Sequence, residues 1–236
     1  MAERPFVSKY RCLKQLFLSN INVHLTVAQS NMPSLSVAQN ANEAFSPSYI
    51  PVMVVTGATS GIGQAITEAL ARHLHGRVHI VLVGRNRTAA EEIIVKLPFA
   101  AEDSRYEFMA CDMTLMSNVH ELSKDLLGRL PKINFLVHSA GVFSLRGRVE
   151  TAEGIDTKLA SQYYSRWALT NDLLPLLRKA SDLGEAASVL SIGGAGRGSE
   201  IDLEDLGLKK NYSGYKAMMQ SISYNDLMVS VSVSSK

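Results

Sequence analysis

A tyrosine and a lysine stand four residues apart near the end of the chain, as Tyr212 and Lys216 in the segment NYSGYKAMMQ. If this segment is helical, both side chains lie on one face, and the lysine ammonium would lower the pKa of the phenol. Such a phenol can donate a proton to a reacting group. The same pair is common on exposed helix surfaces, so its role depends on whether the fold brings it to a ligand site.

A glycine-rich stretch, TGATSGIG, covers residues 56–63. Gly57 would permit a tight turn, Gly61 would let the backbone approach a pyrophosphate, and Gly63 would let a helix pack closely on a sheet. The amides at the start of the following helix would favour the phosphate charge. The stretch lies between an expected strand and an expected helix, which is the position that dinucleotide binding requires.

Apolar runs rich in β-branched residues alternate with helical patterns from residue 50 onward, which is typical of stacked βαβ units. We expect an α/β fold, a Rossmann-like doubly wound parallel sheet whose ligand lies beyond the carboxyl ends of the strands. The expected strands cover residues 52–56, 79–84, 106–112, 133 onward and 187–192. The expected helices follow each strand. The first comes after the glycine-rich stretch, the second covers residues 88–96, the third carries Val119, Leu122, Leu126 and Leu130, and the last two cover residues 155–179 and 213–229.

Five segments together resemble the short-chain dehydrogenase/reductase family, and the long loop GSEIDLEDLGLKKNYSGYKA after the fifth strand resembles its retinol-dehydrogenase-like branch. TGATSGIG is similar to the family's TGxxxGxG, CDMT at 111–114 to its adenine-contacting segment, HSAG at 138–141 to its NNAG, and LTNDLLPLL to its central helix, while GRN at 84–86 ends the second strand. The resemblance extends from residue 50 to residue 228 or so and implies an oxidoreductase that transfers hydride between a nicotinamide nucleotide and a carbonyl or alcohol. The implied cofactor contacts are Gly57, Thr59, Ser60, Gly61, Ile62, Gly63, Arg85, Asp112, Met113, Ser139, Ala140 and Gly141.

The second expected strand also bears on which nucleotide is preferred. An NAD-preferring site usually places a carboxylate about 20 residues beyond the glycines. This chain has Arg85 there, 22 residues after Gly63, with Arg87 close by. A guanidinium suits the 2′-phosphate, so the sequence favours NADP(H) over NAD(H). The alternative is that both arginines lie on a solvated strand end.

Two catalytic positions of the family are occupied by other residue types here. The family has a serine after the fifth strand, where this chain reads SIGGAG, so that Gly193 or Gly194 takes its place. It has an asparagine on the central helix, where this chain has Gln162. His138 replaces the first asparagine of NNAG. The resemblance therefore implies a degenerate catalytic motif.

Two registers are open for the family's catalytic tyrosine and lysine. The simple motif selects Tyr212 and Lys216, whereas alignment with the retinol-dehydrogenase-like branch selects Met218 and Ile222. The registers differ by six residues, about 9 Å of helix rise, so they cannot both serve one nicotinamide. The first predicts an active oxidoreductase, and the second a non-catalytic NADP(H)-binding protein. A truncated product with little function of its own is the third interpretation.

Composition argues against several other classes of protein. With 24 basic and 22 acidic side chains and a net charge of +2, the chain gives no electrostatic case for binding nucleic acid or an anionic membrane. Cys12 and Cys111 have no metal-ligand partners at zinc spacing, which predicts no metal site and a reducing, cytoplasmic compartment. The expected partner is a small-molecule substrate, and analogy with the family allows a homo-oligomer through the central and last helices.

Both ends of the chain lie outside this pattern. Residues 50–236 form the expected dinucleotide-binding domain and residues 1–49 an extension. The extension has no Asp or Glu between Arg4 and Asn42, so it is either disordered, with Met32 as an alternative start, or a mitochondrial transit peptide. At the other end, MVSVSVSSK is unlike a helix continuation. Family members continue through two more strands and a helix, so we expect a truncated product whose sheet is incomplete, with strand five as an open edge.

Overall fold

The computed structural model describes residues 34–144 and 147–234. Its internal contacts divide the chain into two units, Met1–Phe45 and Ser46–Lys236. In the described part of the first unit, the helix α2 (Leu35–Glu43) begins after Ser34, whose hydroxyl accepts a hydrogen bond from the amide of Val37. A helix therefore forms within the segment that was expected to be an extension.

The boundary between the units lies four residues before the expected one, after Phe45 instead of after residue 49. Tyr49 explains the difference, because its hydroxyl accepts a hydrogen bond of 2.9 Å from the amide of Ala186 just before the last strand. The Nζ of Lys132 also lies 4.9 Å from the centre of the Tyr49 ring. The interpretations of residues 1–33 as disordered or as a transit peptide lie outside the described residues.

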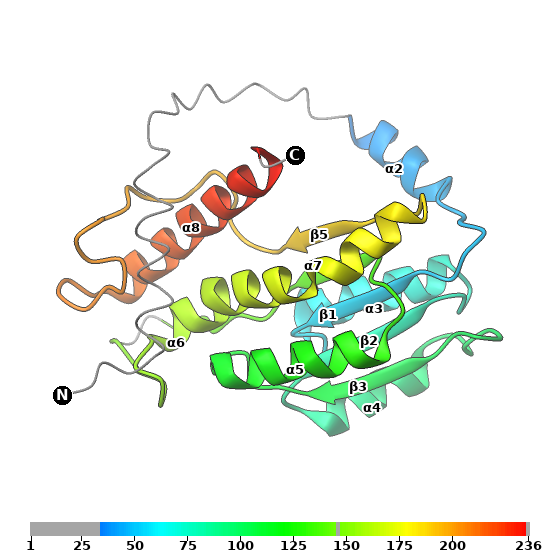
Figure 1. Cartoon of the computed structure of the whole chain (residues 1–236), viewed down its shortest axis with the longest axis horizontal. Coiled ribbons are helices and arrows are strands. Elements are labelled where there is room, and N and C mark those ends of the chain that lie inside the picture. The colour runs from blue at the N-terminus through cyan, green and yellow to red at the C-terminus, as the bar shows by residue number, and fades with distance from the viewer. Residues whose placement is uncertain (1–33, 145–146, 235–236) are drawn as a thin grey trace. The chain divides into compact units, whose positions relative to one another are not determined.

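The second unit is built on a parallel sheet of five strands in the order β3-β2-β1-β4-β5 (Figure 1). The strand order reverses between β1 and β4, which is the switch point of a doubly wound sheet. Every residue of β1 and β2 is buried, as expected for strands covered on both faces. The Rossmann-like α/β fold is confirmed, with these strands: β1 (Val52–Thr56), β2 (His79–Gly84), β3 (Tyr106–Ala110), β4 (Phe135–His138) and β5 (Ser188–Ser191).

Two strands begin and end at the expected residues, β1 and β2, and the other three are shorter than expected. β3 stops before a turn at Asp112, whose Oδ1 accepts from both the amide (2.9 Å) and the hydroxyl (2.8 Å) of Thr114. β4 begins two residues late, because Asn134 uses its side chain to bridge to β1 and accepts from the amide of Val52 (2.9 Å). These side-chain bonds stand beside backbone bonds between the strands, since the amide of Cys111 donates to Gly84 (2.9 Å) and the amide of Asn134 donates to Val52 (2.8 Å).

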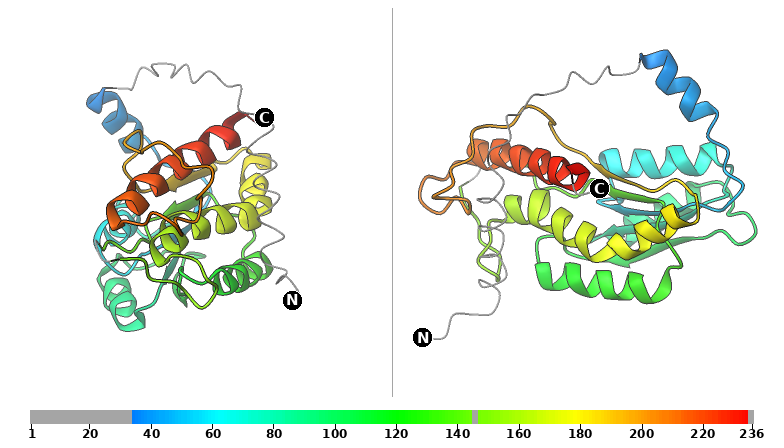
Figure 2. Two further views of the ribbon diagram at one scale, coloured as in Figure 1. Left: turned by 90° about the vertical axis from the view of Figure 1, so that its left-hand side faces the viewer. Right: turned by 45° about the horizontal axis from the view of Figure 1, so that its top comes forward.

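Helices cover both faces of the sheet (Figure 2). One pair lies on one face, α3 (Gly61–His73) and α4 (Arg87–Lys96), and the other pair lies on the opposite face, α5 (Met116–Arg129) and α7 (Ser165–Asp182). α5 and α7 are joined by His120, whose Nδ1 lies 2.6 Å from Oδ2 of Asp172. This arrangement leaves the carboxyl ends of the strands as the place where loops from both faces meet.

The long central helix is interrupted near its start. It consists of α6 (Thr157–Leu159), a π-helical turn η1 (Ala160–Tyr164) and α7, instead of the single helix expected over 155–179. Asp156 starts it, because its side chain accepts from the amides of Lys158 and Leu159. A π turn of this kind is often found beside a functional site.

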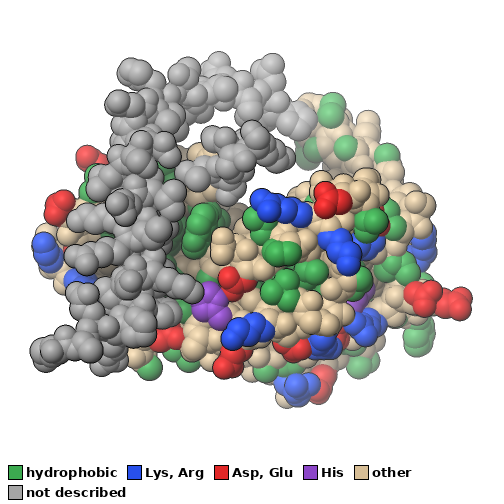
Figure 3. Space-filling model, in the orientation of Figure 1, with side chains coloured by type: hydrophobic (Ala, Val, Ile, Leu, Met, Phe, Trp, Pro, Cys, Tyr) green, Lys and Arg blue, Asp and Glu red, His purple; other side chains and the backbone are tan. Residues whose placement is uncertain are grey.

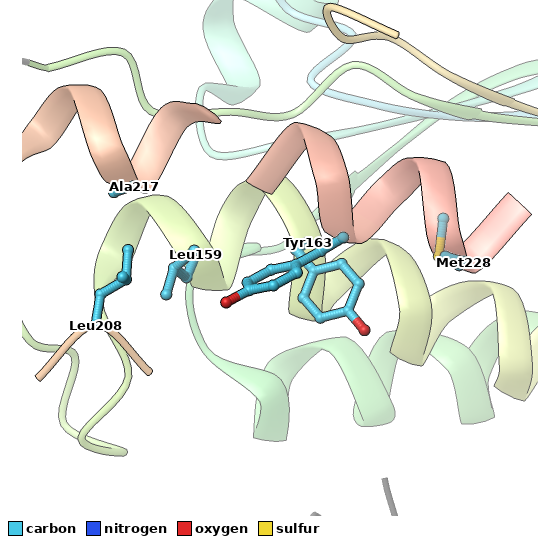
Figure 4. Packing of buried hydrophobic residues seen from close by; sticks show 6 residues of the cluster. Leu159, Tyr163, Leu208, Ala217 and Met228 are labelled. Carbon is cyan, nitrogen blue, oxygen red and sulfur yellow. The ribbon is translucent and has the colours of Figure 1, made fainter. Parts of the chain in front are cut away.

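The last helix, α8 (Gly214–Ser234), is longer than expected. The expected break in the serine–valine alternation after residue 229 was wrong, because the helix continues through it. α8 packs against α6 and η1 through a cluster of buried side chains, and Figure 4 shows Tyr163 between the two helices. The rings of Tyr163 and Tyr224 are 5.1 Å apart. The cluster comprises Leu159, Tyr163, Leu208, Ala217, Tyr224 and Met228.

β5 is the edge of the sheet within the described residues, since it pairs only with β4. Val189 and Leu190 are 40% and 47% exposed, so both faces of this strand are open. Elsewhere, side chains of both charges are interspersed over the surface formed by α5 and α7 (Figure 3). Within the described ranges, every helix is too short or too polar to cross a membrane.

Candidate functional site

A cavity of about 340 Å³ lies at the carboxyl ends of the strands. Its wall comes from the loop after β1, the start of α3, and the ends of β2, β3, β4 and β5. The doubly wound topology brings these segments together, because parallel strands all end at the same edge of the sheet. The lining residues are Gly57, Thr59, Ser60, Gly61, Ile62, Gly84, Arg85, Cys111, Asp112, Met113, Thr114, Ser139, Ala140, Gly141, Val142, Ser161 and Ile192.

The three glycines of the loop after β1 have three different roles. Gly57 has a φ of +70°, and a Cβ there would lie 2.7 Å from the amide nitrogen of Ala140. Gly63 is packed still more tightly, because its Cβ would lie 2.3 Å from the carbonyl oxygen of Gly57. Gly61 has a φ of +58° and faces open space. Gly57 and Gly63 therefore hold the loop, β4 and α3 together, while Gly61 leaves the backbone accessible from the cavity.

The start of α3 adjoins the cavity, since Ser60, Gly61 and Ile62 all line it. The Ser60 side chain makes no capping hydrogen bond, and no acidic residue lies in the first turn. The first amides of a helix lack partners within the helix and carry partial positive charge. The loop thus fits a phosphate group, which needs close backbone approach and unpaired N–H donors.

Arg85 lines the cavity beyond β2, and among the described residues it takes part in no ion pair. Arg87 is directed elsewhere, because it lies 3.7 Å from a carboxylate oxygen of Glu91 and 5.0 Å from the centre of the Phe108 ring. The structure thus places the two arginines differently, and only Arg85, the predicted contact, lines the cavity. Arg85 alone is placed to bind an anion in the cavity.

Cys111 also lines the cavity, beside Asp112. Burial raises the pKa of its thiol to about 11, with smaller contributions from the carboxylates of Asp112 and Glu121. A thiol with such a pKa stays protonated at neutral pH and is a poor nucleophile. Cys111 therefore contributes packing to the wall of the cavity.

At the opposite end of the cavity, Arg166 on α7 fastens the ends of β4 and β5. Its Nη1 donates to Oγ of Ser191 (2.8 Å) and to the carbonyl oxygen of Ile192 (2.7 Å), and its Nη2 donates to the carbonyl oxygen of Ala140 (3.1 Å). Arg166 is 5% exposed, and its Nε has no partner. His138 at the end of β4 is fully buried beside it, with Nε2 2.9 Å from the hydroxyl of Thr170.

Gln162, in the π turn, joins the central helix to the cavity and to α8. Its Nε2 donates to the carbonyl oxygen of Val142 (2.8 Å), and its Oε1 accepts from the hydroxyl of Ser221 (2.9 Å). Its backbone carbonyl accepts from Nδ2 of Asn225 (2.8 Å), and Oδ1 of Asn225 in turn accepts from Ser191 (3.1 Å). The position of the family's asparagine is thus part of a hydrogen-bond network that links η1 to α8 and, through Ser191, to the guanidinium of Arg166.

Tyr212 and Lys216 lie outside the cavity and are not paired with each other. The Tyr212 hydroxyl accepts from Nζ of Lys158 (2.7 Å), and Nζ of Lys216 lies 3.8 Å from Oδ2 of Asp202. Burial first, and then the charge of Asp156, raises the pKa of the Tyr212 phenol, which is the opposite of what the acid–base role requires. The Tyr212 side chain is held away from the cavity because the residue precedes α8 and packs over the start of the central helix.

The other register predicted from the sequence has Met218 and Ile222 at the catalytic positions, and its Ile222 lies against the loop after β5. A Cβ at Gly194 would come within 3.0 Å of Cδ1 of Ile222, and Ser221 beside it reaches Gln162. Ile222 of the second register therefore lies beside the loop after β5, although neither Met218 nor Ile222 lines the cavity. In the part of the chain that the structure describes, the cavity is lined by no tyrosine and no lysine.

Eleven of the twelve predicted cofactor contacts line this one cavity, and the exception is Gly63, whose role is packing. Sequence reasoning missed six lining residues. Three of them, Gly84, Cys111 and Thr114, lie inside the motifs GRN and CDMT, and Val142 directly follows HSAG. Ile192 is the last residue of the expected fifth strand, and Ser161 carried no local signal. No group of metal-ligating residues occurs in the described ranges.

The chain belongs to the short-chain dehydrogenase family, because residues 51–200 match the family described as short chain dehydrogenase. An oxidoreductase of Emericella nidulans is 34% identical over 196 residues, which are 83% of this chain and 57% of the relative. A polyprenol dehydrogenase of Homo sapiens is 28% identical over 178 residues, 75% of this chain and 53% of the relative. The chain thus spans about half the length of the curated relatives it matches.

Solved structures show the same fold. The Pseudomonas aeruginosa RhlG/NADP active-site complex has a TM-score of 0.58 at 19% identity, covering 76% of this chain and 64% of that one. An NADH-dependent reductase complexed with NAD has a TM-score of 0.59 at 23% identity, covering 79% and 73%. At these identities the likeness concerns the fold alone, and the two neighbours carry different nucleotides.

Proposed function

We propose that the protein is an NADP(H)-dependent oxidoreductase that binds its nucleotide in the cavity and transfers hydride between the nicotinamide and a carbonyl or alcohol. The observation that carries the proposal is the glycine loop at the switch point, where unpaired amides of α3 face a cavity that eleven of the predicted contacts line. Membership of the family supports oxidoreductase chemistry. The name of one relative, polyprenol dehydrogenase, supports an alcohol as the class of substrate.

The preference for NADP(H) rests on Arg85. Arg85 lines the cavity at the end of β2, where an adenosine ribose would approach, and it takes part in no ion pair of the described residues. A charge-assisted hydrogen bond to a 2′-phosphate contributes about 1.5–3 kcal/mol, or roughly tenfold to a hundredfold in affinity. The solved structures with this fold carry either NADP or NAD, so the fold does not distinguish the two nucleotides. The preference for NADP(H) over NAD(H) is supported by Arg85.

The test is a fluorescence titration of the full chain with NADPH and with NADH. We expect NADPH to bind more tightly, and Arg85→Gln to weaken NADPH by about tenfold or more while leaving NADH nearly unchanged. Arg87→Gln is the matched control, because that arginine pairs with Glu91 and does not line the cavity. Failure to bind either nucleotide would refute the site, and an unchanged preference in Arg85→Gln would refute the role of the arginine.

A second candidate function is nucleotide binding without turnover, and the position of Tyr212 favours it. Its hydroxyl is engaged by Lys158, and Met218 and Ile222 belong to the register beside the β5 loop. Oxidation of NADPH with a panel of carbonyl compounds separates the two candidates. Turnover that persists in Tyr212→Phe would establish the first candidate with a different proton donor, whereas tight binding with no turnover would establish the second.

A further inference from the structure

Arg166 brings a buried positive charge to one end of the cavity, and no carboxylate of the described residues forms an ion pair with it. Its three hydrogen-bond acceptors are a hydroxyl and two backbone carbonyls. None of the ion pairs among residues 34–144 and 147–234 includes it. Buried arginines usually lie beside a carboxylate, because an uncompensated charge in a protein interior is unfavourable. A buried cation with neutral partners therefore points to a role in the site.

The charge persists at neutral pH. Burial lowers the pKa of the Arg166 guanidinium to about 10, which still leaves it protonated. The neighbouring imidazole of His138 carries no charge, because burial and then Arg166 lower its pKa to about 3. The two carbonyls that Arg166 binds belong to Ala140 and Ile192, which both line the cavity. The guanidinium is thus fixed one residue layer behind the cavity wall.

This end of the cavity is the one left for the nicotinamide half of a bound nucleotide. The glycine loop would take the pyrophosphate, and Arg85 the adenosine ribose, on the β2 side of the switch point. The remaining wall consists of Ala140, Gly141, Val142, Ser161 and Ile192. A nicotinamide ring carries a positive charge when oxidised and none when reduced, so a fixed cation nearby acts differently on the two forms.

We propose that Arg166 makes the site bind reduced nicotinamide nucleotide in preference to the oxidised form, by repelling the charge of the oxidised ring. The inference rests on the proposed nucleotide function and adds to it the redox form that the site selects. A unit charge within about 10 Å, at the effective dielectric constant of a protein interior, changes the affinity for a second unit charge roughly tenfold. Arg166 is here a positioning and electrostatic residue, since it does not itself line the cavity.

The test measures the dissociation constants of NADPH, by fluorescence, and of NADP⁺, by calorimetry, for the full-length protein and its variants. Arg166→Gln and Arg166→Met both remove the charge, and they should lower the ratio of the NADP⁺ to the NADPH constant by about tenfold. Arg166→Lys retains the charge and should keep the ratio. Arg178→Gln is the matched control, because it removes an exposed charge from the same helix, 12 residues or about 18 Å further along.

The possible results separate this inference from the function on which it rests. A merely structural arginine would weaken both forms equally when replaced, and an unchanged ratio in the two charge-removing variants would overturn the inference. Equal binding of NADPH and NADP⁺ by the wild-type protein would also overturn it, even if no variant folds, and would leave the proposed function intact. Binding of neither form would overturn both proposals.

Discussion

Replacing Gly63 by alanine tests the close contact on which the geometry of the cavity depends. The added Cβ would lie 2.3 Å from the carbonyl oxygen of Gly57 and 2.9 Å from its carbonyl carbon. Both neighbours are backbone atoms, so the clash can be relieved only if α3 moves away from the loop by about 1 Å, which overpacking data place at about 1–3 kcal/mol. For a domain of this size each kcal/mol lowers the melting temperature by roughly 2–4 °C. The same shift would carry the first amides of α3 away from a bound phosphate, so NADPH affinity should fall as well.

The matched control is Gly128→Ala, and the assays are thermal unfolding and NADPH titration. Gly128 lies inside α5 with no atom within 4 Å of an added Cβ, so alanine there should raise stability by about 0.5–1 kcal/mol through its better helix propensity. If Gly63→Ala were as stable as the wild type and bound NADPH equally well, helix and loop would not touch as described, and the explanation of the glycine pattern would be wrong.

Three further predictions concern buried polar groups. Tyr212→Phe removes the acceptor of the Lys158 ammonium, so the free energy of unfolding in urea should fall by about 1–3 kcal/mol while the affinity for NADPH stays the same. An altered NADPH affinity would mean that Tyr212 belongs to the nucleotide site. Asn134→Ala removes the side chain that bonds to the Val52 amide and to the Ala186 carbonyl, so the free energy of unfolding should fall by about 2–3 kcal/mol, seen as a lower melting temperature. An unchanged melting temperature would mean that this bridge does not form. His138 has a pKa lowered to about 3 in the folded protein, against about 6.5 when unfolded. Because the unfolded protein then binds a proton that the folded protein does not, the free energy of unfolding decreases as the pH falls below 6.5, by about 2 kcal/mol at pH 5. In urea unfolding, His138→Gln should lose about 2 kcal/mol less than the wild type between neutral pH and pH 5.

The fold could be predicted from the sequence where burial or backbone geometry restricts the residue type. The strands β1 and β2 are covered on both faces, so they are continuous apolar runs with clear ends. The glycines at 57 and 63 are required by contacts shorter than any Cβ tolerates. The end of α8 could not be predicted, because its serine–valine alternation has the period of a strand. Packing of Tyr224 and Met228 against the central helix overrides that local pattern.

The nucleotide side of the site was predictable and the catalytic side was not. The first is built from short loops at strand ends, so neighbouring residues in the sequence are neighbours in the cavity. The second depends on where α8 lies relative to the central helix. Tyr212 was placed by Lys158, a residue 54 positions away, and Arg166 gave no local signal, because its significance lies in burial without a carboxylate. Such features arise from tertiary packing alone.

The π turn at the start of the central helix accommodates one extra residue, because a π turn holds about one residue more than an α turn. Deleting one residue between Ala160 and Tyr164 would therefore give an ordinary helix and leave the side chains on either side in nearly the same orientation. Leu159 would keep its packing against α8, and Arg166 would keep its bonds to the strand ends. Homologues with an uninterrupted central helix should accordingly align with a one-residue gap in this turn and without a shift on either side of it.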